Sequence, residues 1–108
     1  MELNEKVDLI VNALEDKKAL DVEKMDISKL TIIADYFIIC SGTSSTHVKG
    51  IADGVEFKLK EAGIEYNRIE GYNTAKWILM DYGDIIVHVF YEEDRQYYNL
   101  ERLWKAVK

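Results

Sequence analysis

Apolar residues recur every three or four positions in three segments of the chain, which is the spacing of one face of an α-helix. The first segment covers residues 2–16, and its stripe consists of Leu3, Val7, Ile10, Val11 and Leu14. The second begins after Ser44 or Ser45, either of which can cap a helix, and its stripe consists of Val48, Ile51, Ala52, Val55, Leu59 and Ala62. The third follows the acidic residues 92–94, and its stripe consists of Leu100, Leu103, Trp104 and Val107. We expect three helices, with Gly63 in the left-handed conformation after the second.

Segments with strand character lie between the predicted helices. Residues 36–40 form an uninterrupted β-branched and aromatic run, which predicts a strand covered on both faces at the centre of a sheet. Leu20 and Val22 alternate with acidic residues, as in a short strand with one solvent-exposed face. Residues 66–69 predict another short strand, and the turn formers in residues 26–31 predict a single helical turn before the central strand.

Two further apolar runs, residues 77–80 and 85–90, are separated by four residues that include Gly83. This arrangement predicts a β-hairpin. The resulting order of elements is α, β, β, α, β, β, β, α. It predicts a single domain over residues 1–108 of the α/β (α+β) class, with a mixed sheet of about five strands flanked by helices.

Composition and charge limit the classes of partner and the cellular compartment that we expect for this chain. The chain has 108 residues, 48% of them hydrophobic, and a net charge of −6, which disfavours direct nucleic-acid binding and suits a basic protein partner. Cys40 is the single cysteine, so no intrachain disulfide forms. Because the sequence opens without a signal-peptide pattern and has no apolar run of about 20 residues, we expect a cytoplasmic protein without a membrane span.

The turn at residues 42–45 follows a strand and opens a helix, where a phosphate could meet backbone N–H groups. No glycine-rich phosphate motif is present, and an ordinary turn with a helix cap is the stronger interpretation. A nucleotidyl-transferring enzyme would need carboxylates that converge on a magnesium ion, and the only tight candidates are Asp81 and Asp84, which flank the hairpin turn. We therefore expect no enzyme activity, with a nucleotide-binding or nucleotidyl-transferring enzyme that uses this turn as the alternative.

The remaining reactive side chains also favour structural roles. His47 and His88 are the only histidines, and neither has a Cys or His at metal-ligand spacing. We expect His88 to lie mid-strand on the same side as Ile86 and Phe90, and His47 to be solvated or to face a partner. Cys40 is expected to be a small buried residue, because no neighbouring base would activate it.

Trp77 is the strongest candidate for an anchor in a protein–protein interface, although burial in the core is equally compatible with its position. Strand alternation places Trp77, Leu79 and Asp81 on one side of the strand and the residues between them on the other. One side can then face a helix while the other faces a partner. Trp104, on a helical stripe, is expected in the core.

Three blocks of sequence resemble the Iojap/ribosomal silencing factor family. They are TIIADYFIICSGTSS at residues 31–45, GYNTAKWILMDYGDIIVHVF at residues 71–90 and RQYYNLERLWKAV at residues 95–107. The resemblance implies a nucleotidyltransferase-like fold in a family not known for transferase activity. We expect no cofactor and no metal. The resemblance also implies a translation repressor that binds the large ribosomal subunit through its fourteenth ribosomal protein, which is basic, at the intersubunit face, and blocks association with the small subunit.

Taken alone, the charged residues of the hairpin turn would be interpreted as an ordinary solvated turn. The same resemblance makes a binding surface the stronger interpretation. It favours a partner-binding surface made of Trp77, Leu79, Met80, Asp81, Tyr82 and Asp84. A homodimer of the free protein, joined through an edge strand, is a further alternative and is compatible with ribosome binding.

Overall fold

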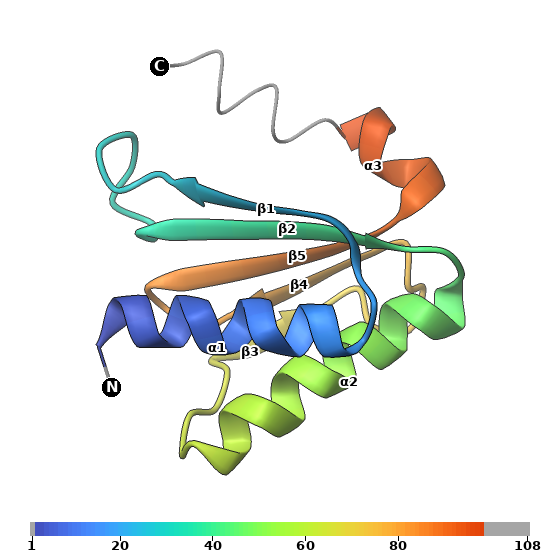
Figure 1. The fold of residues 1–108 in the computed structure, drawn as a ribbon. Helices are drawn as coiled ribbons and strands as arrows, with labels where there is room; N and C mark the ends of the chain where they lie inside the picture. The colour runs from blue at the N-terminus through green and yellow to red at the C-terminus, as the bar shows by residue number, and fades with distance from the viewer. Residues whose placement is uncertain (1, 99–108) are drawn as a thin grey trace.

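The computed structural model describes residues 2–98, which form a five-stranded sheet with helices packed against it (Figure 1). The elements are α1 (Leu3–Asp16), β1 (Leu20–Asp26), β2 (Tyr36–Gly42), α2 (Ser45–Glu61), β3 (Arg68–Glu70), β4 (Trp77–Asp81), β5 (Ile85–Tyr91) and α3 (Glu92–Tyr98). This order confirms the predicted α+β class. The stripe predicted for the last helix, from Leu100 to Val107, lies outside the described residues.

The strands lie in the order β1-β2-β5-β4-β3. β2 and β5 run parallel, with Tyr36 opposite Ile85 at one end and Gly42 opposite Tyr91 at the other. The other three pairs are antiparallel, including the predicted hairpin of β4 and β5. Because β2, β5 and β4 each have a neighbour on both sides, they form the interior of the sheet, and β1 and β3 are its edges.

Helices α1 and α2 cover one face of the sheet, which we call the helix side (Figure 1). The helix residues buried there are Val7, Ile10, Ala13, Leu14, Val48, Ile51, Ala52, Val55 and Leu59. They match most of the predicted stripes, but Ala13 was not predicted, Leu3 and Val11 are only partly buried, and Ala62 is exposed. Ser44 caps α2 by accepting a hydrogen bond from the N–H of His47, and Gly63 follows the helix with φ +79°, as predicted.

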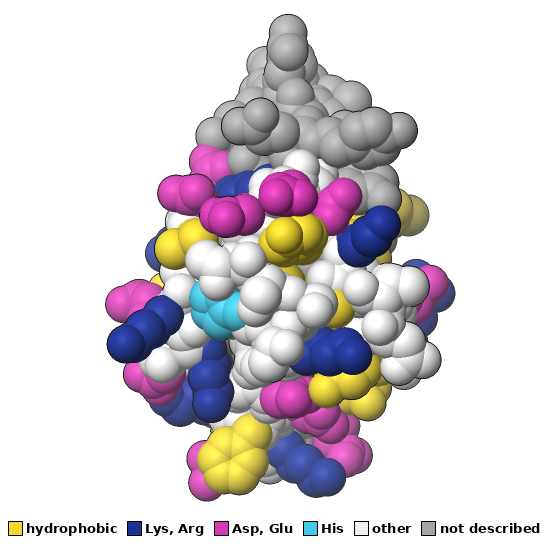
Figure 2. Space-filling model, turned by 90° about the vertical axis from the view of Figure 1, so that its right-hand side faces the viewer, with side chains coloured by type: hydrophobic (Ala, Val, Ile, Leu, Met, Phe, Trp, Pro, Cys, Tyr) yellow, Lys and Arg dark blue, Asp and Glu magenta, His cyan; other side chains and the backbone are white. Residues whose placement is uncertain are grey.

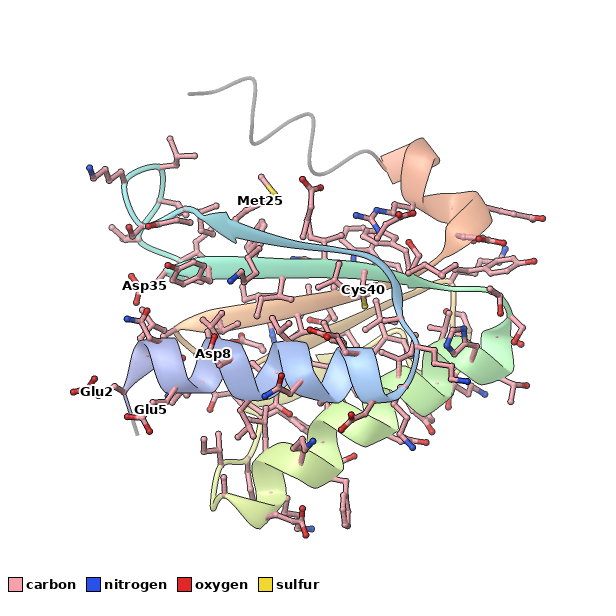
Figure 3. All side chains as sticks on the ribbon, in the orientation of Figure 1. Glu2, Glu5, Asp8, Met25, Asp35 and Cys40 are labelled. Carbon is pink, nitrogen blue, oxygen red and sulfur yellow. The ribbon has the colours of Figure 1, made fainter. Side chains whose placement is uncertain are left out.

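The opposite face of the sheet, which we call the second face, carries a separate apolar cluster. Its buried residues are Met25, Ile27, Ala34, Phe37, Ile39, Ile86 and Phe90, and the partly buried residues against it are Leu30, Trp77 and Leu79. Figure 3 shows the division directly, because Met25 points away from α1 and α2 whereas Cys40 points toward them. Among residues 2–98, no helix is long and apolar enough to cross a membrane.

Two strand boundaries differ in detail from the sequence expectation. β1 continues to Asp26, and it contains a bulge near Asp21, whose φ of +49° accompanies a register shift. β3 begins only at Arg68. The expected single turn is present after β1, where the carbonyl of Ile27 accepts hydrogen bonds from the N–H groups of Leu30 and Thr31.

Gly50 and Gly54 offer a matched test of how α2 packs. A Cβ at Gly50 would meet nothing within 4 Å, whereas one at Gly54 would lie 2.7 Å from Lys17 Cγ. We expect Gly50→Ala to raise the free energy of unfolding by about 0.5–1 kcal/mol, because alanine favours a helix interior over glycine. Gly54→Ala should gain less or lose stability, because Lys17 must move. Urea denaturation compares the two, and equal gains would contradict the close approach of Lys17.

Candidate functional site

The side chains of β4 alternate strictly between the two faces of the sheet. Ile78 and Met80 are fully buried on the helix side, whereas Trp77 and Leu79 are half-buried on the second face. This alternation was predicted from the sequence. Trp77 is therefore neither a core residue nor a freely exposed one.

Two members of the predicted partner-binding set do not belong to that surface. Met80 is fully buried, and Tyr82 is only 7% exposed, both in the core on the helix side. Tyr82 packs edge-on against Tyr66, with ring centroids 6.3 Å apart. Their inclusion was wrong because it followed nearness in sequence rather than the face on which each side chain lies. The second face keeps Trp77 and Leu79 from the predicted set.

Trp77 is held in place by a histidine on the neighbouring strand. Its indole N–H donates a hydrogen bond of 3.0 Å to Nδ1 of His88. The indole also stacks on Phe90, with ring centroids 5.1 Å apart and an interplanar angle of 24°. These two contacts fix both the tilt and the rotation of the ring. A partner would meet an indole that is already ordered, which reduces the entropy lost on binding.

His88 itself is almost fully buried, at 3% exposure, and lies beside Ile86 and Phe90 as predicted. Phe37 packs against its ring edge-on at 4.7 Å. Burial lowers the pKa of His88 to about 4, so the ring is neutral near pH 7. Because Nδ1 accepts from Trp77, the proton resides on Nε2, which is buried and has no hydrogen-bond partner.

The two acidic residues of the predicted partner-binding set already have partners within the chain. Asp81 accepts a hydrogen bond of 2.8 Å from the N–H of Gly83 and lies 3.5 Å from Arg68 Nε. Asp84 forms a 3.0 Å ion pair with Lys6. Both carboxylates are partly exposed, at 22% and 30% of their side-chain area. Asp81 orders the hairpin turn, whereas Asp84 joins the turn to Lys6 on α1 and keeps its Oδ1 buried. They can attract a basic partner only through the parts of the two carboxylates that stay exposed.

Backbone N–H groups at the turn of residues 42–45 and at the start of α2 donate hydrogen bonds within the chain. The N–H of Thr43 donates to His47 Nδ1 at 2.9 Å, and the N–H of His47 donates to Ser44 Oγ at 3.0 Å. His47 Nε2 lies 2.8 Å from the carbonyl of Lys17, so this ring joins the turn to the end of α1. His47 therefore bridges two segments of the chain, a role that sequence reasoning missed. The geometry favours the helix cap over a phosphate site.

Neither a metal site nor a reactive thiol is formed by the described residues. Across residues 2–98, no three His, Cys, Asp or Glu side chains come together as metal ligands would. Cys40 is fully buried, and burial raises the pKa of its thiol to about 12, with Arg95 acting weakly in the opposite direction. Cys40 is thus the small buried residue that the sequence predicted, and its thiol is not nucleophilic in the folded state.

Arg95 was not singled out from the sequence, yet it joins α3 to the sheet. Its Nη1 donates to Ser41 Oγ at 2.9 Å, and its Nη2 lies 3.8 Å from a carboxylate oxygen of Glu23. The arginine is 9% exposed and Ser41 is 1% exposed. A buried arginine is uncommon, and only its spatial neighbours could identify it.

Acidic side chains gather where α3 begins, as Figure 2 shows near its top, and the first turn of this helix contains Glu92, Glu93 and Asp94. Below them, in the same view, basic and acidic side chains are interspersed. This face does not present the concentrated positive charge that binds nucleic-acid phosphates.

The whole chain, residues 1–108, matches the family described as "Ribosomal silencing factor during starvation". A relative from Halalkalibacterium halodurans, named Ribosomal silencing factor RsfS, is 46% identical over 104 residues, which are 96% of this chain and 89% of the relative. A crystal structure of a protein from Chromobacterium violaceum superimposes with a TM-score of 0.95 at 42% identity, covering 97% of this chain and 88% of that one. A mouse relative, named Mitochondrial assembly of ribosomal large subunit protein 1, is 32% identical over 91% of this chain and 44% of its own length.

The buried neutral His88 predicts a specific dependence of stability on pH. The pKa is about 4 in the folded chain against an ordinary value of 6.5. Between these values the unfolded chain binds a proton that the folded chain does not. The contribution of neutral His88 to the free energy of unfolding is therefore fully present above about pH 6.5. It falls, by up to about 3 kcal/mol, as the pH drops toward 4.

Urea denaturation of the wild type and of His88→Asn between pH 7 and pH 4 measures this loss. Asparagine keeps an acceptor for the Trp77 indole but does not titrate in this range. The difference in unfolding free energy between the two proteins should shrink as the pH falls. A difference that is constant across the range would show that His88 is not buried as a neutral ring.

Proposed function

Because the chain belongs to the ribosomal silencing factor family, a family of ribosome-associated translation repressors, we propose that it binds the large ribosomal subunit through its fourteenth protein and sterically blocks subunit association. The observation that carries this proposal is the match of all 108 residues to the family, with 46% identity to a named silencing factor. The name of the mouse relative, which refers to assembly of the ribosomal large subunit, supports the choice of subunit.

The second face of the sheet supplies a suitable docking surface. Trp77 and Leu79 lie on this face, while α1 and α2 cover the other one. A half-buried tryptophan with a rigid orientation has the character of an interface hot spot. We assign it the central contact, with Leu79 beside it and the exposed parts of Asp81 and Asp84 at the rim.

The charge of the chain fits a basic ribosomal protein. A net charge of −6 attracts such a partner, speeds the encounter and orients it, although the effect is screened by salt. Repression in this mechanism needs no chemical step and no cofactor, because the bound protein occupies space that the small subunit requires.

Self-association through a strand edge is less well supported. Among the described strands, β3 is only three residues long, and β1, at the other edge, carries the bulge near Asp21. Short and bulged edges resist pairing with another sheet.

Trp77→Ala tests the docking surface. We expect the affinity for isolated large subunits, measured by co-sedimentation, to fall about thirtyfold, as for loss of a hot spot worth roughly 2 kcal/mol. Because the indole is only half-buried, the loss of stability should be smaller than the roughly 3–5 kcal/mol typical of a core tryptophan. The same variant should fail to reduce the yield of joined ribosomes.

Phe57→Ala provides a matched control, since Phe57 is an exposed aromatic residue on α2, on the helix side of the molecule. It should bind large subunits normally. Wild-type protein that binds only small subunits, or that leaves subunit joining unchanged at saturation, would contradict the steric mechanism. Equal effects of the two variants would contradict the assignment of the surface.

A further inference from the structure

The loop between β1 and β2 presents two bulky apolar side chains to solvent. Ile32 is fully exposed and Ile33 is 65% exposed. Phe57 is the only other large hydrophobic residue in the described part of the chain with comparable exposure. Single exposed apolar residues are ordinary on protein surfaces, but two adjacent isoleucines at a loop tip form a small patch that favours contact with a partner.

Hydrogen bonds within the loop hold this pair in a fixed position. The carbonyl of Ile27 accepts from Leu30 and Thr31, and the hydroxyl of Thr31 accepts from the N–H of Ile33 at 3.1 Å. The N–H of Ile27 donates to the carbonyl of Asp35, which closes the base of the loop. The loop tip is therefore ordered before any partner arrives, which lowers the entropic cost of contact.

The base of the loop is continuous with the proposed docking surface. Leu30 and Ile27 belong to the second-face cluster, against which Trp77 and Leu79 also pack. Figure 1 shows the loop rising from the sheet on the side away from α1 and α2, and Figure 3 places Asp35 at its base. The N–H of Asp35 donates to the carbonyl of Asp84 at 2.8 Å, which joins the loop to the hairpin turn.

The size of the patch decides what can cover it. A stable complex buries roughly 1,200–2,000 Å² in total, far more than two isoleucine side chains provide. The pair can therefore act only as part of a larger interface, and the adjoining one is the second face. We propose that Ile32 and Ile33 form a second anchor, which inserts into an apolar pocket of the same large-subunit protein that Trp77 and Leu79 contact. This inference rests on the proposed function.

The double variant Ile32→Ser/Ile33→Ser tests the second anchor. Both side chains are largely exposed, so the thermal unfolding midpoint should not change. The affinity for isolated large subunits should fall at least about tenfold, because serine removes the apolar contacts that the two isoleucines make with the partner. Ile32→Leu/Ile33→Leu should keep most of the affinity, because the apolar character remains. Phe57→Ser, which removes an exposed apolar side chain from the helix side, should bind as the wild type does.

The outcomes separate this inference from the function on which it rests. If wild-type protein does not bind large subunits, both fail. If the wild type binds and Trp77→Ala weakens binding but the double serine variant binds normally, the second anchor alone is overturned. If the double variant converts a dimer of the free protein to a monomer while its subunit affinity is unchanged, the loop pairs two copies of the chain instead. Ile32→Ser alone, at the more exposed position, repeats the test should the double variant unfold.

Discussion

The parallel pairing of β2 with β5 determines where every other part of the molecule lies. It places both strands inside the sheet, where β4 is the third interior strand, so both are buried on the two faces, and it sets one register from Tyr36–Ile85 to Gly42–Tyr91. Because side chains alternate with a period of two, a slip of one residue would exchange the faces of an entire strand. If β2 slipped in this way, Cys40 would leave the helix side. The helix-side core and the second face both depend on this register.

The second face combines apolar packing with one polar contact. The bond from Trp77 to His88 orders the indole, but it leaves His88 Nε2 buried without a partner. An unsatisfied buried donor is destabilising by about 1–3 kcal/mol. A phenylalanine in place of His88 would avoid that penalty and would lose the acceptor for the indole. The histidine is therefore better explained by the orientation of Trp77 than by stability.

The sequence predicted the elements and faces well because these depend on local periodicity. The alternation of Trp77 and Leu79 with their buried neighbours needed only the strand period, and the cap at Ser44 needed only its position before an apolar stripe. The Trp77–His88 bond was beyond reach, because it requires the register of β4 against β5. Arg95 was missed for a similar reason, since its partners Ser41 and Glu23 lie on other strands. Met80 was misassigned because residues adjacent in sequence were treated as one surface.

The rate at which the single thiol of the chain is alkylated can be used to measure how often the sheet opens. Cys40 lies on an interior strand with none of its surface exposed, and its thiol remains protonated at ordinary pH. Only an exposed thiolate attacks a thiol reagent, so alkylation of Cys40 requires that β2 first separates from its neighbours. The rate at which the chain gains one adduct in a mass spectrum then follows opening events of the interior strands. Fraying at the chain ends would leave that rate unchanged. The alkylation rate of Cys40 therefore reports the stability of the parallel strand pair.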